Sequence, residues 1–225
     1  MAATRALIVV LAAAVLAAPA AYGASGDPKV AHTPAGTVAA QKPLLKKSDF
    51  GKGWKATPAT KPKANALCKD TRPNLSDLTE TGYALAPDFA LGQLQAVSQW
   101  VRVYKSAKQA ETAYSRSVTI GLVSCLAKQL QAASNSKAKV TIKGQYRLAL
   151  PKAAQQADGF RVVAHTVADS GKETFDVFAD VLVLRQGATV TTVTMTGFIQ
   201  PLATSFENSL ARVIGSRLGA RPGGA

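Results

Sequence analysis

The sequence predicts an α+β fold: an antiparallel sheet of about five to six strands, covered on one face by two or more helices and holding one disulfide. Segments rich in Val, Thr and aromatic residues follow one another through the second half of the chain, with short turns between them. Stretches with helical spacing flank this run, and the chain contains two cysteines. Consecutive strands with short turns pair antiparallel, and helices outside such a run pack on the sheet.

The N-terminus has the composition of a secretory signal peptide. Arg5 precedes an uninterrupted apolar run from Ala6 to Ala18, and small residues surround Pro19. A spanning helix needs roughly 20 apolar residues, so this run is short for one. We expect a signal peptide over residues 1–23 and a secreted or extracytoplasmic protein; an uncleaved anchor is the alternative.

Composition divides the remaining chain into three segments. Residues 24–43 contain three prolines and no apolar period, which predicts a disordered linker. Residues 44–218 have the length and patterning of a single α+β domain. Residues 219–225, rich in glycine, are expected to form a flexible tail.

Within the domain the predicted elements follow the order β-α-β-β-β-β-α. QAVSQWVRVY, residues 95–104, alternates apolar and polar side chains and predicts a strand. Ser106 caps a helix whose apolar stripe rotates near Gly121, which indicates a kink or break. Four further strands are predicted at 140–150, 158–168, 173–187 and 188–198, followed by an amphipathic helix at 202–218.

Cys68 and Cys125 are the two cysteines of the chain. In an oxidising compartment, two cysteines in a domain of this size are usually bonded. A bond between them would close a loop of about 58 residues and contribute roughly 4 kcal/mol in the chain-entropy account. A buried unpaired thiol and a reactive cysteine are the alternatives.

The chain lacks the common motifs of catalysis and metal binding. Its two histidines are His32 and His165, and it has no His-Glu-x-x-His, Cys-x-x-Cys or phosphate-binding glycine loop. We therefore expect no enzyme activity, no cofactor and no metal site. A hydrolase that uses Asp176 and Asp180 is kept as an unfavoured alternative.

One face of the predicted strand at 173–187 mixes aromatic, acidic and apolar side chains. Such a face on the uncovered side of a sheet is typical of a ligand site. The residues expected to line this site, for a small or lipidic ligand of the cell envelope, are Trp100, Arg102, Tyr104, His165, Phe178 and Asp180. Alternatively, residues 55–90 cover this face and Asp180 pairs with Arg102 or Arg161.

The chain is strongly basic, with a net charge of +14 at pH 7, and nine positive residues lie between Lys42 and Arg72. An exported protein meets little nucleic acid, so we expect no nucleic acid partner. Anionic polymers or membrane surfaces of the envelope are the expected counterpart, bound through Lys46, Lys47, Lys52 and Lys55. A solvated loop is the alternative, and the oligomeric state is left open.

The pattern Asp49-Phe50-x-x-Gly53-Trp54, followed by Trp100-Val101, Ser106-Ala107, Ala110, Ala113-Tyr114 and Cys125-Leu126, is similar to a family of exported actinobacterial domains. These resemble the extracellular sensor domain of PknH-type Ser/Thr kinases. The resemblance implies an antiparallel sheet packed with helices, disulfides, and a non-enzymatic sensor role. This chain has no kinase domain and has cysteines for one disulfide where the kinase sensor has two. The PsbP-type fold of lipoprotein-like domains also has a Gly-Trp near its start and is the alternative.

Overall fold

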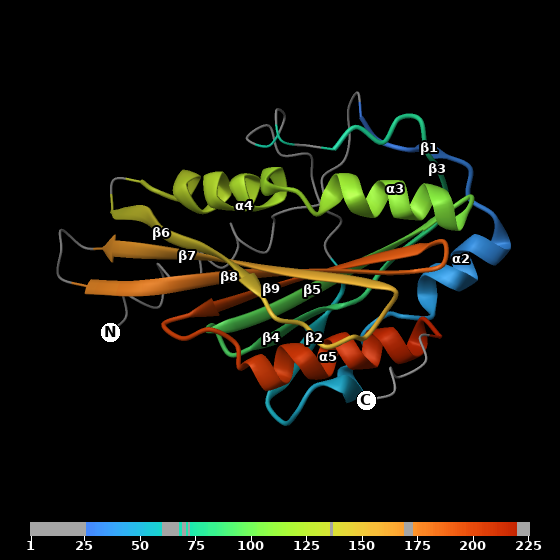
Figure 1. The fold of residues 1–225 in the computed structure, drawn as a ribbon. Helices are drawn as coiled ribbons and strands as arrows, with labels where there is room; N and C mark the ends of the chain where they lie inside the picture. Colours follow the sequence, from blue (N-terminus) through green and yellow to red (C-terminus); the bar gives the residue numbers. More distant parts are fainter. Residues whose placement is uncertain are drawn as a thin grey trace.

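The computed structural model describes residues 26–59, 68, 71, 73–135, 137–168 and 173–219. The predicted signal peptide and residues 220–225 of the predicted tail lie outside the described residues. The elements follow in the order β1 (Lys29–Val30), α2 (Pro34–Gln41), the 3₁₀ turn η1 (Lys47–Asp49), β2 (Trp54–Thr57), β3 (Thr79–Leu85), β4 (Asp88–Leu91), β5 (Gln95–Tyr104), α3 (Ala107–Ser117), α4 (Ile120–Ala132), β6 (Ala138–Leu148), β7 (Gln156–Ala168), β8 (Glu173–Gln186), β9 (Thr189–Phe198) and α5 (Thr204–Arg217) (Figure 1).

The strands of the described chain form one nine-stranded sheet in the order β1-β3-β5-β9-β8-β7-β6, with β4 paired to both β2 and β5. Strands β5 to β9 pair antiparallel, as the sequence predicts. The α+β class is therefore confirmed, but the sheet is larger than expected. It is also mixed, because β1 pairs parallel with β3.

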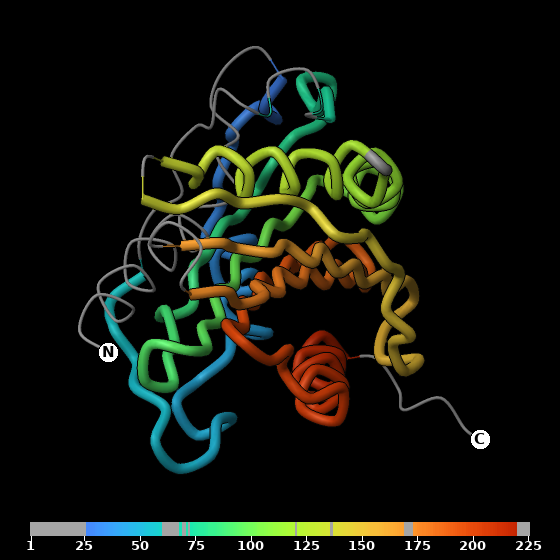
Figure 2. Tube along the Cα trace, turned by 90° about the vertical axis from the view of Figure 1, so that its left-hand side faces the viewer, coloured from blue at the N-terminus to red at the C-terminus, as the bar shows by residue number. Residues whose placement is uncertain are grey.

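Helices cover both faces of this sheet, whereas the sequence predicts cover on one face. Figures 1 and 2 show α3 and α4 on one side and α5 on the other. Strand β8 explains why two covers are needed. Phe175, Val177 and Val181 pack in the core beneath α3 and α4. Leu182 and Leu184 pack against α5 and are fully buried. A strand that is apolar on both faces loses stability unless each face is shielded from water.

Residues 26–43 are ordered, so the predicted disordered linker is wrong for this segment. Thr33 caps α2 by accepting a hydrogen bond from the backbone of Gly36, and Pro34 occupies the first turn, where its missing N–H costs nothing. The helix approaches β3 so closely that a Cβ on Gly36 would lie 2.1 Å from the carbonyl oxygen of Thr81. Two residues that resemble a linker in the sequence therefore have structural roles: Pro34 begins α2, and Gly36 allows its close contact with β3.

The break expected near Gly121 is present, because α3 ends at Ser117 and α4 begins at Ile120. The short strands β2, β3 and β4 are not among the strands that the sequence predicts. Strands β3 and β4 pair with successive parts of β5, and β2 is bonded to β4. Their stability comes from this pairing with a long buried strand, and their own sequences alternate only weakly.

Candidate functional site

The sheet separates the six residues that were expected to line one ligand site. Paired residues on neighbouring strands share a face. Trp100 pairs with Thr192 on β9, whereas Leu182 pairs with the adjacent residue, Val193. Trp100, Arg102 and Tyr104 therefore face α3 and α4, and His165, Phe178 and Asp180 face α5. The expectation of one shared site is wrong. A difference of one residue in the register of β5 relative to β8 is enough to place the side chains of β5 on the opposite face of the sheet.

On the α3 and α4 face, Trp100 and Tyr104 are buried. The Arg102 Nε lies 3.3 Å from a carboxylate oxygen of buried Glu80, and its guanidinium lies 5.8 Å from the centre of the Tyr83 ring. The other Glu80 oxygen lies 2.7 Å from Nε2 of His32. These three predicted residues thus belong to the core and to an internal ion pair.

On the α5 face, Asp180 lies in a buried ion cluster. Arg161 donates to both of its carboxylate oxygens, at 2.7 and 2.9 Å, and donates to Glu207 of α5 at 2.6 Å. The alternative that pairs Asp180 with Arg161 is therefore confirmed. The cover comes from α5, with Phe89 and the 44–54 loop in the same core cluster.

His165 lies farther along this face and is paired with Asp176. Its Nδ1 lies 2.8 Å from Oδ1 of Asp176, and the Lys143 Nζ lies 3.3 Å from the same oxygen. Burial alone would raise the pKa of Asp176, but hydrogen bonds with His165 and Lys143 hold it below its ordinary value. Phe178 is half-buried, with the Arg161 guanidinium 5.9 Å from its ring centre.

The two aspartates are poorly placed for hydrolysis. Four residues along one strand correspond to about 13 Å between Asp176 and Asp180, at roughly 3.3 Å per residue. Glycosidase carboxyls are separated by about 5 to 10 Å. Each aspartate is also engaged in its own ion pair. In the described part of the chain, no group of three or more His, Cys, Asp or Glu could hold a metal ion.

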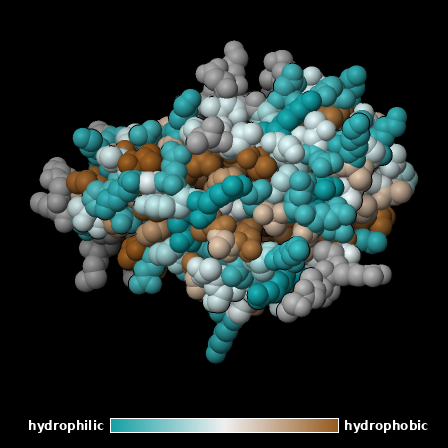
Figure 3. Space-filling view, viewed as in Figure 1, coloured by the Kyte–Doolittle hydropathy of each residue, from teal (hydrophilic) through white to brown (hydrophobic). Residues whose placement is uncertain are grey.

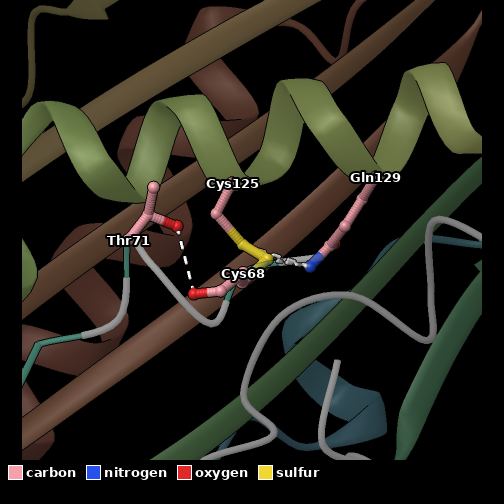
Figure 4. Close-up of a disulfide and its surroundings, with 4 residues drawn as sticks. All are labelled: Cys68, Thr71, Cys125 and Gln129. Atoms are coloured by element: carbon pink, nitrogen blue, oxygen red, sulfur yellow. Dashed lines mark hydrogen bonds between the residues drawn. A yellow bond between two sulfur atoms is a disulfide. The ribbon is translucent and has the colours of Figure 1, made fainter. Parts of the chain in front are cut away.

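The predicted disulfide between Cys68 and Cys125 is present, with its Cα atoms 5.1 Å apart (Figure 4). Cys125 lies on α4, and both half-cystines are buried. Gln129, one helical turn after Cys125, donates from Nε2 to both sulfurs at 3.0 and 3.2 Å. The prediction of a structural bridge is confirmed, and the two alternatives for these cysteines are excluded.

The four lysines that were predicted to bind anions all lie on one compact segment, residues 44–57, which we call the lysine lobe. It consists of η1, a glycine-containing turn and β2. All four side chains are exposed, and within the described residues none of them is part of an ion pair: Lys46, Lys47, Lys52 and Lys55.

Aromatic stacking fixes the lysine lobe to the body of the protein. The Phe50 ring lies 4.0 Å from that of Phe89, and the Trp54 ring lies 5.4 Å from that of Phe206 on α5 (centre to centre). Asp49, the acidic residue of the lobe, forms two 2.7 Å hydrogen bonds with Arg217 of α5. Burial opposes ionisation of Asp49, but the contact with Arg217 lowers its pKa. Its charge is thus neutralised locally, and the lysines are left in excess.

An apolar groove of about 350 Å³ lies between the α3–α4 break and the strands β6 and β7. Hydrophobic surface is visible between these helices and the sheet in Figure 3. The groove is lined by Val118, Val123, Gln145, Tyr146, Arg147 and Phe160. A second hollow, of about 690 Å³, lies by residues 73–77 and the start of α4, and its lining is mixed polar and apolar. Its arginine, Arg116, is paired with Asp77.

Sequence reasoning missed Glu207, Glu80 and the bond between Asp49 and Arg217. A signal for Glu207 exists, because it precedes Leu210 by three residues and Ile214 by seven, and so lies on the inward stripe of α5. A carboxylate at such a position needs a buried partner. Asp49 and Arg217 are 168 residues apart, and no local pattern joins them.

No family model matches this chain, and a search of curated proteins found no match. A search of solved structures found the extracellular domain of PknH from Mycobacterium tuberculosis, at 12% sequence identity and a TM-score of 0.43. The match covers 85% of this chain and 100% of that domain. The resemblance indicated by the sequence motifs is thus confirmed as a weak likeness. No helix of the described residues is long and apolar enough to cross a membrane.

Proposed function

We propose that this protein is an exported, non-enzymatic binding domain that attaches to an anionic polymer of the cell envelope through the lysine lobe. One observation carries the proposal: four exposed lysines extend from one ordered segment whose acidic residue, Asp49, is already neutralised by Arg217. Such a surplus of one sign attracts a polyanion and raises the rate of association.

The attachment of the lobe favours binding. Phe50 and Trp54 are buried, and their ring contacts reach β4 and α5. A backbone that is already fixed loses less conformational entropy when a partner binds than a mobile loop would lose. The lysine side chains themselves remain free to follow a flexible polymer.

The buried disulfide supports a location outside the cytoplasm. Disulfides persist in oxidising compartments and are rare where thiols are kept reduced. The composition of residues 1–23 supports export independently. Linear phosphate polymers and anionic lipid headgroups are the anions that such a location offers.

A polymer suits this surface better than a membrane does. Binding to a bilayer interface by a surface segment relies on apolar or aromatic side chains that enter it, in addition to charge. Both aromatic side chains of the lobe point into the protein and are less than 8% exposed. The exposed side chains of the lobe are lysines and small residues.

The test uses poly(glycerol phosphate) as the polymer and vesicles of phosphatidylglycerol and phosphatidylcholine as the membrane arm. The native chain is expected to bind the polymer with an affinity that falls steeply with salt. For nucleic-acid polyanions each neutralised phosphate contributes about 0.7 to 0.9 to the slope of log affinity against log salt. A variant with Lys46, Lys47, Lys52 and Lys55 changed to Gln should lose most of this slope. Binding that is independent of salt, or that is confined to vesicles, would contradict the proposal.

A second candidate function is the binding of a small or lipidic ligand in the groove beside β6. Its volume of about 350 Å³ lies within the range of small-molecule sites, roughly 300 to 1,000 Å³. Phe160, paired with Val181 of the α3–α4 face, forms an apolar wall of the groove opposite Val118 and Val123. A fluorescent long-chain fatty acid should bind saturably and more weakly to Phe160→Ala. Equal binding by both proteins, or none by the native chain, would remove this candidate.

A further inference from the structure

The ion cluster beneath α5 holds two carboxylates and one cation. Asp180 and Glu207 have side chains that are 0% and 1% exposed, and the Arg161 side chain is 15% exposed. The three residues come from β8, α5 and β7, so the cluster joins the helix to the sheet. Two ionised carboxylates here would leave a net negative charge in a dry interface, which is costly.

The cluster becomes neutral when one carboxyl keeps its proton. Burial raises the pKa of Glu207 to about 8, and the negative charge of Asp180 acts in the same direction. Arg161 lowers this pKa but does not cancel the effect, because Asp180 already occupies two of its N–H groups. A protonated Glu207 can still accept from Arg161 through one oxygen.

Among the described residues, the groups that pair with the cluster or neighbour it supply no second cation. On β9 the residue paired with Asp180 is Met195, and on β6 the residue paired with Arg161 is Tyr146. On α5 the neighbouring Asn208 is neutral, and its side-chain oxygen is buried without a partner in the described structure. The nearby Lys143 and His165 are paired with Asp176.

Apolar contacts supply most of the remaining interface of α5. Leu210, Ala211 and Ile214 are almost fully buried in a cluster with Leu182, Leu184 and Met195. At the other end of the helix, Arg217 binds Asp49 of the lysine lobe. The first turn is thus held by a group whose charge depends on pH, and the rest is held by contacts that do not titrate near neutrality.

We propose that Arg161, Asp180 and Glu207 form a proton-dependent latch, which holds the first turn of α5 on the sheet while Glu207 is protonated and weakens as it ionises. Release of this turn would expose Phe206 and part of the apolar surface around Leu182 and Met195. The sheet would then present an apolar patch beside the lobe.

The direction of the pH effect follows from linkage. The pKa of Glu207 is raised above its ordinary value of 4.5, to about 8, in the folded protein. Its contribution to holding α5 is therefore fully present below 4.5 and is lost as the pH rises to about 8. Within this window the equilibrium constant for opening the helix should rise about tenfold per pH unit, and it should level off above 8.

The test is amide hydrogen exchange of the full chain from pH 5 to 9, with α4 as the internal reference. Opening constants of the α5 amides are expected to rise with pH in the native chain, and those of α4 are expected to stay constant. Glu207→Gln mimics the protonated state and should remove the rise. Glu111→Gln, which changes an exposed glutamate on α3, should leave it in place.

Equal pH dependence in native chain and Glu207→Gln would overturn the proposal, as would α5 opening constants that do not change from pH 5 to 9. If Glu207→Gln does not fold, the carboxyl carbon of Glu207 in the native chain can be followed by NMR. A titration near pH 8 is expected, and one near 4.5 would reject the latch.

Discussion

The two helical layers on this sheet are held in different ways. The α3–α4 layer packs through apolar side chains and is tied covalently by Cys125 to Cys68. The α5 layer also packs through apolar side chains, but its ties are ionic: the Arg161 cluster at one end and Arg217 with Asp49 at the other. Among the described residues the α3–α4 layer also has an ion pair, Arg116 with Asp77, but its side chains are 39% and 57% exposed, and such a surface pair contributes little. The ionic ties of the α5 layer are more buried, so the stability of this layer depends more on pH.

The difference indicates which layer is suited to respond to surroundings. A disulfide is insensitive to pH near neutrality, and Gln129 adds hydrogen bonds to its sulfurs. The α5 layer carries the lysine lobe through Phe206 and Arg217, so a change in α5 reaches the surface that we propose to bind polymer. We infer that the α3–α4 layer mainly contributes stability, and that the α5 layer supports the surface that we propose to bind polymer.

Removal of Arg161 should have the largest effect. In Arg161→Leu the Asp180 carboxylate loses its cation and the protonated Glu207 loses its hydrogen-bond donor. The loss of one partner of a buried ion pair costs about 3 to 5 kcal/mol. The free energy of unfolding from urea titration at pH 7 measures this. As a control, Lys143→Leu breaks a half-exposed pair with Asp176 and should cost about 1 kcal/mol or less. Similar losses in both variants would show that the cluster has no special role.

Removal of the disulfide should cost nearly as much but should not depend on pH. The double variant Cys68→Ser, Cys125→Ser frees a loop with a sequence separation of 57 residues. In the chain-entropy account this corresponds to about 4 kcal/mol, mainly through the unfolded state. Urea titrations at pH 5 and 8 should give the same loss. A loss that differs between the two values would link the disulfide to the ion cluster and end the contrast between the layers.

A third, smaller effect is expected at Gly215 of α5. A Cβ at this position would lie 1.8 Å from the carbonyl oxygen of Ala153, so the helix would have to move away from the 153 loop. Alanine favours a helix over glycine by about 1 kcal/mol. We nevertheless expect Gly215→Ala to destabilise by about 1 to 3 kcal/mol, because overpacking outweighs that gain. Ser216→Ala, on the exposed side, is the control for thermal unfolding, and a stabilised Gly215→Ala would contradict the packing described.

The sequence predicts the central fold well, because alternation in residues 95–104 and 140–198 reports which segments are strands. It does not predict the N-terminal elements. Prolines and glycines are common in linkers, and Pro34 and Gly36 give no local sign that they start a capped helix and allow its close contact with β3. The candidate ligand site failed for a geometric reason. The alternation in the strands of Trp100 and Phe178 was read correctly. Which face each residue occupies depends on how β5 and β8 are each paired with β9, and local sequence does not show this. The disulfide was predicted correctly, since redox chemistry depends little on strand register. The four lysines that were predicted to bind anions are all exposed, and anion binding itself stays a prediction.

The proposed binding of polymer by the lysine lobe, which the α5 layer supports, is tested most directly by two variants with equal net charge. One changes Lys46, Lys47, Lys52 and Lys55 of the lobe to Gln. The other changes four exposed lysines on or beside the α3–α4 layer and β6 to Gln: Lys105, Lys108, Lys128 and Lys139. Affinity for poly(glycerol phosphate) is measured at low and physiological salt. We predict that the lobe variant loses most of the affinity and that the second variant keeps most of it. Equal losses would show that net charge alone governs binding, and would contradict the assignment of the lobe.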